Sequence, residues 1–103
     1  MFSASAIEPA VRKFIVERGL PGIGAAGPKE LNAVAETDNR IVSELGPDIQ
    51  WVTSFIADDK TYCIYLAKDE ETVRRHSELA GFPADKILEL KRQIDPTTPY
   101  DTS

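Results

Sequence analysis

The order of strand and helix patterns constrains the fold of this chain most. Three β-branched or aromatic stretches predict strands, at 13–18, 49–57 and 61–67. Two segments with apolar residues at helical spacing predict helices, at 28–45 and 70–80. The helices alternate with the strands so that only one more strand, at the end, is needed to give the strand–helix–strand–strand–helix–strand order of the ferredoxin-like fold.

The last segment, 84–94, is ambiguous. Ile87, Leu90 and Ile94 have helical spacing, whereas 86–90 can equally form the strand that completes the sheet. We predict an α+β protein, ferredoxin-like βαββαβ, with a four-stranded antiparallel sheet and both helices on one face. The other face would be bare and apolar, so we expect a homodimer that pairs sheet to sheet, a dimeric α+β barrel.

Signals for helix ends support both helices. Pro28 suits the first position of a helix, because its missing N–H is not needed there. Gly46 is expected as a left-handed cap, with Pro47 preventing continuation. Asp69 is expected to cap the second helix at its N-terminus, and Gly81 to end it.

The chain is one domain by length, because 103 residues suffice for a single core only. We expect the domain to span 13–94, with a flexible arm at 1–12 and a flexible, proline-punctuated tail at 95–103. The glycine-rich stretch 19–27 contains a G-x-G-x-x-G pattern, but no acidic ribose partner follows a second strand. It is therefore predicted to be a flexible loop, without a nucleotide cofactor.

Composition excludes several classes of function. The net charge of −5 and the absence of a basic stripe argue against a nucleic-acid partner. No segment has the pattern of a signal peptide or the length of a membrane span, which predicts a cytoplasmic protein with no membrane partner. Cys63 is the only cysteine, so an intrachain disulfide and a multi-cysteine zinc site are both excluded.

His76 is the only histidine, and it lies between Val73 and Ala80 on the apolar face of the second helix. Burying a polar ring without a partner costs on the order of 1–3 kcal/mol. His76 is therefore either a hydrogen-bonded structural residue or the centre of a site. Asp38 interrupts the apolar stripe of the first helix, which makes it the acidic counterpart of His76.

Strand parity suggests which other polar residues could join His76. It groups residues of each strand on one face: Cys63 with Tyr65, Glu17 with Ile15 and Lys13, and Ser54 with Val52 and Ile56. If these faces coincide, the polar cluster is Glu17, Ser54, Cys63, Tyr65 and His76.

Each member also has a structural explanation. Cys63 can be an inert core residue, and Tyr65 can simply bury its ring. Glu17 can be a solvated charge at the strand end, paired with Arg18 or Lys13. Trp51 and Phe55, placed on one face by parity, would be core or dimer contacts.

The chemistry of the cluster allows two functions. An imidazole, a thiolate and a carboxylate together suit nickel, copper or zinc, although carboxylates, waters or a second subunit must complete the shell. Alternatively, His76 oriented by Asp38 or Glu17 could transfer a proton, with Tyr65 binding a substrate oxygen.

Several segments resemble a known family. They are Phe14-Ile15-Val16-Glu17-Arg18, Trp51-Val52-Thr53-Ser54-Phe55 with Asp59-Lys60, Tyr62-Cys63-Ile64-Tyr65, and the stretch from His76 to Ile87. They resemble the signatures of small bacterial nickel-responsive, nickel-binding ferredoxin-like proteins, over roughly 13–90. The resemblance implies a dimeric ferredoxin-like fold with a strand as the final element. It also implies that Glu17, Ser54, Cys63, Tyr65 and His76 occupy the family's recurrent polar positions.

The chain departs from the family pattern in its glycine-rich first loop, and in Ala67-Lys68 where the family tends to have Ala-Pro. Combining these observations, we expect a metal-binding homodimer, with nickel or another divalent transition metal held by His76, Glu17 and Cys63. Tyr65, Ser54 and Asp38 are further pocket residues. The alternatives are a cofactor-free α+β-barrel enzyme acting on a small organic ligand, and a structural or interaction dimer in which His76 is merely hydrogen-bonded.

Overall fold

The structure, a computed structural model, describes residues 11–100. Most of the predicted N-terminal arm and the last three residues of the predicted tail lie outside the described residues. The elements follow in this order: β1 (Arg12–Gly19), η1 (Ile23–Ala25), α2 (Pro28–Leu45), η2 (Gly46–Asp48), β2 (Ile49–Ile56), β3 (Lys60–Ala67), α3 (Glu70–Ala80), β4 (Lys86–Leu90) and η3 (Thr98–Tyr100).

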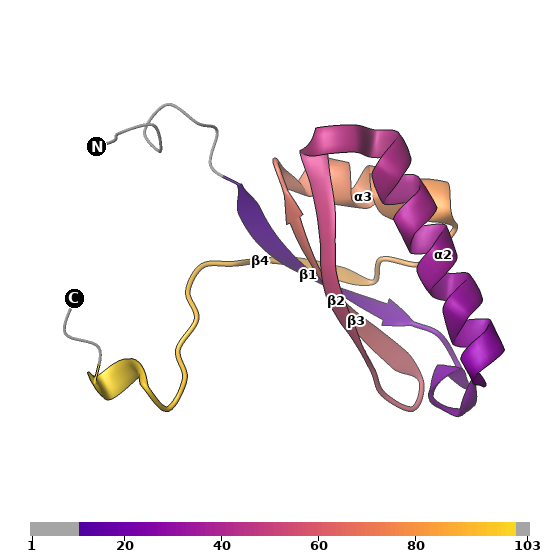
Figure 1. The fold of residues 1–103 in the computed structure, drawn as a ribbon, viewed down its shortest axis with the longest axis horizontal. Helices are drawn as coiled ribbons and strands as arrows, with labels where there is room; N and C mark the ends of the chain where they lie inside the picture. The colour runs from indigo at the N-terminus through magenta and orange to yellow at the C-terminus, as the bar shows by residue number, and fades with distance from the viewer. Residues whose placement is uncertain (1–10, 101–103) are drawn as a thin grey trace.

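The four strands form one antiparallel sheet with the order β2-β3-β1-β4. This is the predicted α+β class with its four-stranded antiparallel sheet, and the element order is that of the ferredoxin-like fold. Figure 1 shows both helices on the same side of the sheet, with α2 in purple to magenta and α3 in orange.

The ambiguous last segment is a strand. β4 pairs with β1 in antiparallel register, placing Val16 opposite Ile87 and Ile15 opposite Leu88. The segment 86–90 forms a strand despite the helical spacing of its apolar residues. Five of its residues pair with the free edge of β1, and Ile87 packs against the core.

Local signals set the helix ends. Asp69 caps α3, because its Oδ1 accepts hydrogen bonds from Thr72 N at 2.8 Å and Thr72 Oγ1 at 2.7 Å. Gly81 ends the helix at φ 76° and ψ 21°, in the left-handed region. Gly46 also has a positive φ of 71°, but its ψ of −138° lies outside the left-handed helical region, which corrects the expected cap geometry.

The core lies between the helices and the sheet. Alternate residues of β1 and β3 point toward the helices and are buried: Phe14, Val16 and Arg18 in β1, and Thr61, Cys63, Tyr65 and Ala67 in β3. Val73 of α3 and Ile49 of β2 complete this cluster. Glu17 and Ile15 consequently point to the opposite face.

A register shift between Trp51 and Thr53 changes the parity of β2. Ser54 is half-buried on the helix side with Trp51, whereas Phe55 is exposed on the other face. The expectation that Trp51 and Phe55 share a face was therefore wrong. The reason is a bulge, which inserts one residue into the strand and reverses the alternation beyond it.

The glycine-rich loop is hydrogen-bonded to the turn between β2 and β3. Gly24 N donates to Asp58 O at 2.9 Å, and Leu20 N donates to Asp59 O at 2.8 Å. A Cβ on Gly24 would lie 2.7 Å from Ala57 O, so only glycine permits this close approach. The loop is thus held against the turn between β2 and β3.

The sheet face opposite the helices, called here the open face, carries large exposed apolar side chains. Val52 is 49% exposed, Phe55 60% and Leu88 52%. Val52, Phe55 and Leu90 lie along one shallow groove of this face. Within the described part of the chain, no helix is both long enough and apolar enough to cross a membrane.

Candidate functional site

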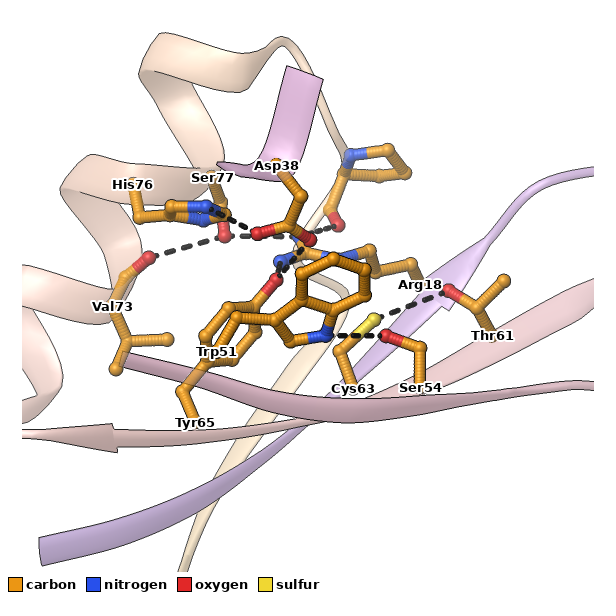
Figure 2. A network of polar contacts seen from close by, with 11 residues as sticks. Arg18, Asp38, Trp51, Ser54, Thr61, Cys63, Tyr65, Val73, His76 and Ser77 are labelled. Carbon is orange, nitrogen blue, oxygen red and sulfur yellow. Dashed lines mark hydrogen bonds and ion pairs between the residues drawn. The ribbon is translucent and has the colours of Figure 1, made fainter. Parts of the chain in front are cut away.

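The candidate site is a buried polar network between the two helices and the sheet (Figure 2). His76 of α3 is completely buried, and Asp38 of α2 is 2% exposed. The Nε2 atom of His76 lies 2.8 Å from Asp38 Oδ1. The structure thus brings the only histidine to the acidic residue that interrupts the α2 stripe.

Tyr65 joins this pair from the sheet below. Its hydroxyl donates to Asp38 Oδ2 at 2.7 Å, and its ring centroid lies 4.9 Å from that of His76. Burial raises the pKa of Tyr65, and the neighbouring charge of Asp38 adds to this rise, although Arg18 opposes it. Tyr65 therefore remains protonated and serves as a hydrogen-bond donor to Asp38.

Arg18 is the network's positive charge. Its side chain is 1% exposed and donates from Nη2 to Tyr65 Oη at 3.1 Å, and from Nη1 to Ser77 Oγ at 2.9 Å and Pro83 O at 2.8 Å. Burial alone would lower the pKa of Arg18, but Tyr65 and Cys63 outweigh it, so the pKa is raised. The guanidinium remains charged.

Arg18 belongs to this network although the sequence did not predict it as a site residue. It appeared there only as a surface partner for Glu17. The strand period could have predicted its burial. Arg18 lies two residues after Val16 and four after Phe14, so it shares their face of β1, which is the core face.

Several buried atoms of the network lack hydrogen bonds. They are Asp38 Oδ1, both ring nitrogens of His76, and Arg18 Nε. The His76–Asp38 contact has the length of an ion pair, but it does not meet the geometry of a hydrogen bond. The 2.8 Å distance nevertheless places the ring and the carboxylate in direct contact.

Of the remaining predicted site residues, Glu17 lies on the opposite face of the sheet, whereas Ser54 and Cys63 lie beside the network. Glu17 points to the open face and pairs with Lys60 at 2.9 Å, so the structure does not bring it to His76. Ser54 and Cys63 do lie on the helix side. Ser54 Oγ accepts a hydrogen bond from Trp51 Nε1 at 2.9 Å, and the Cys63 thiol lies 3.7 Å from Thr61 Oγ1.

A cavity of about 220 Å³ adjoins the network, between α2 and the sheet. Its wall includes Arg18, Asp38, Ser54 and Cys63, but neither His76 nor Tyr65. Within residues 11–100, no three His, Cys, Asp or Glu side chains are grouped so as to hold a metal ion. The geometry therefore gives one imidazole–carboxylate pair, stabilised by Tyr65 and Arg18.

Fold and site together define a small α+β protein with a ferredoxin-like sheet and a buried His–Asp–Tyr–Arg network. The sequence model of the nickel-responsive, SCO4226-like protein family matches residues 14–90. The chain belongs to this family.

A crystal structure of SCO4226 from Streptomyces coelicolor A3(2) is similar, with a TM-score of 0.67 and 24% sequence identity. The similarity covers 80% of this chain and 99% of that one, and it supports the fold. No curated protein is found to match the chain.

Proposed function

We propose that this chain binds a divalent transition metal, nickel first, with His76 as the anchoring ligand and Asp38 beside it. The observation that carries the proposal is the 2.8 Å approach of the His76 ring to a carboxylate oxygen that, like both ring nitrogens, is buried without a hydrogen bond. Membership of a nickel-responsive family points to the same metal.

The donor types fit nickel, although the protein supplies few of them. Imidazole nitrogen suits nickel, and square-planar sites with nitrogen and oxygen ligands are typical of Ni²⁺. Glu17 lies across the sheet, so the proposal takes Asp38 as the partner of His76 in place of the expected Glu17 and Cys63. Water would have to fill the remaining positions, from the side of the cavity that Asp38 borders.

The first test is calorimetric titration of the metal-free protein with Ni²⁺. We expect binding to the wild type that is lost in His76→Gln and weakened in Asp38→Asn. Glu17→Gln is the matched control, because it removes a carboxylate from the opposite face. Circular dichroism of each variant checks that it is folded.

Two results would reject the proposal. One is the absence of Ni²⁺ binding to the wild type. The other is loss of binding in Glu17→Gln with binding kept in a folded His76→Gln protein, which would put the metal on the open face. In either case His76 would be a structural residue that contacts Asp38 in the core.

We also propose that the protein is a cytoplasmic homodimer, with the open faces of two copies packed together. The exposed apolar side chains of that face support this, because large apolar patches on small proteins mark interaction surfaces. An enzyme using His76 as a base is less favoured, because the His76 ring is completely buried and does not line the cavity.

A further inference from the structure

The cavity beneath α2 has an origin in the sequence of that helix. Leu31, Val34 and Ala35 form the first half of its apolar stripe, yet they are only half-buried. In the second half, by contrast, Ile41 is 3% exposed, and Val42 and Leu45 pack against the core. The apolar side chains in the first half of α2 instead border the cavity of about 220 Å³.

The opposite wall is also mainly apolar. Trp51 and Ile56 of β2 face the helix across the cavity, and Ile23 closes one side. Ile23 belongs to the loop that Gly24 fixes against the turn between β2 and β3. This wall is therefore built into the fold, as expected for a pre-formed ligand site.

The size of the cavity sets the size of its ligand. An apolar cavity of about 150 Å³ in a protein core is sufficient to bind benzene. A cavity of 220 Å³ can accommodate a single aromatic ring with a short substituent. Trp51 adds an aromatic surface against which a ring can pack.

The charges in the wall set the charge of the ligand. Arg18 and Asp38 carry opposite charges and are linked through the hydroxyl of Tyr65. Because the two compensate each other, an ionised ligand would bring an unpaired charge into an apolar space, at a high cost in desolvation.

We propose that this cavity is a binding site for a neutral, single-ring aromatic molecule. The cavity adjoins the proposed metal site, because Asp38 lies in its wall, whereas the His76 ring does not border it. The binding test is therefore made on metal-free protein, where its outcome does not depend on whether nickel binds.

Benzyl alcohol is a suitable probe, and benzoate and benzylammonium are charged counterparts of similar size. Trp51 is the only tryptophan and lies in the cavity wall, so its fluorescence reports occupancy. For so small a ligand we expect a dissociation constant on the order of 1 mM. The two ions should bind about tenfold more weakly or not at all, because of their desolvation.

A matched pair of variants locates the binding. Ala35→Leu adds bulk inside the cavity, whereas Ala33→Leu makes the same change at an exposed position of the same helix. We expect Ala35→Leu to abolish the fluorescence response and Ala33→Leu to retain it. Equal responses from both variants would overturn the assignment of the site.

Cys63 gives a second readout that needs no substitution. Its thiol is 4% exposed and lies in the cavity wall, so a small thiol reagent must reach it through the space that the ligand would fill. Benzyl alcohol should slow this reaction in the wild type, and benzoate should not. Absence of both the fluorescence change and the protection would refute the proposal.

Discussion

At the scale of residues, Tyr65 holds together two buried charges that do not touch. Its hydroxyl donates to Asp38 Oδ2 and accepts from Arg18 Nη2. Without it, each charged group would lose a hydrogen-bond partner in the protein interior. Leaving a buried polar group unsatisfied costs about 1–3 kcal/mol, and more when the group is charged.

We therefore predict that Tyr65→Phe destabilises the protein by about 2–4 kcal/mol. Tyr62→Phe is the matched control, because Tyr62 is half-buried on the open face. Loss of the Tyr62 hydroxyl should change the free energy of unfolding by no more than about 0.5 kcal/mol. Urea unfolding measures both values, and equal effects would show that the Tyr65 hydroxyl does not support the network.

The raised pKa of Tyr65 gives a second prediction, at alkaline pH. In the unfolded chain a tyrosine ionises near pH 10, whereas burial keeps Tyr65 neutral in the folded protein. Its contribution to stability is complete below about pH 10 and is lost as the pH rises further. Tyr65→Phe should therefore show a shallower alkaline loss of stability than Tyr62→Phe, measured by urea unfolding between pH 8 and pH 11.

At the scale of elements, the sequence predicted what depends on local chemistry. Both helices were predicted with their observed ends, since Pro28 and Asp69 act within a single turn. The bulge in β2 and the strand β4 were not determined, because each depends on pairing with a distant segment. Arg18 was missed for a related reason: a buried charge is tolerated only where distant partners such as Ser77 and Pro83 receive it.

The cap of α3 provides a prediction at this scale. Hydrogen bonds from the Thr72 side chain and backbone lower the pKa of Asp69 in the folded protein. The stability that this carboxylate contributes is present above its unfolded pKa, near 3.9, and is lost as the pH falls through the lower folded pKa.

Asp69→Asn should therefore reduce the acid sensitivity of unfolding while keeping the cap, because asparagine caps helices about as well as aspartate. Asp69→Ala should lower the stability at neutral pH as well, since it removes the cap itself. Thermal unfolding between pH 2 and pH 7 separates the two variants. An unchanged acid slope in Asp69→Asn would contradict the role given to this carboxylate.

At the scale of the whole molecule, the helices cover one face of the sheet and leave the other open. The open face exposes Phe55 and Leu88 to solvent, and an antiparallel sheet with a solvated face usually carries polar residues there. A second copy of the chain would bury these side chains. The proposed metal site and the cavity lie on the helix side, so dimerisation would leave both unobstructed.

We predict that Leu88→Lys shifts the proposed dimer to monomer, because a lysine buried between two open faces must lose its hydration. Leu79→Lys is the matched control: Leu79 lies on α3 and is 47% exposed, compared with 52% for Leu88. Sedimentation equilibrium should therefore give a dimer for the wild type and Leu79→Lys, and a monomer for Leu88→Lys. A wild type that remains monomeric would reject the dimer. A monomer from Leu79→Lys alone would instead place the interface on the helices.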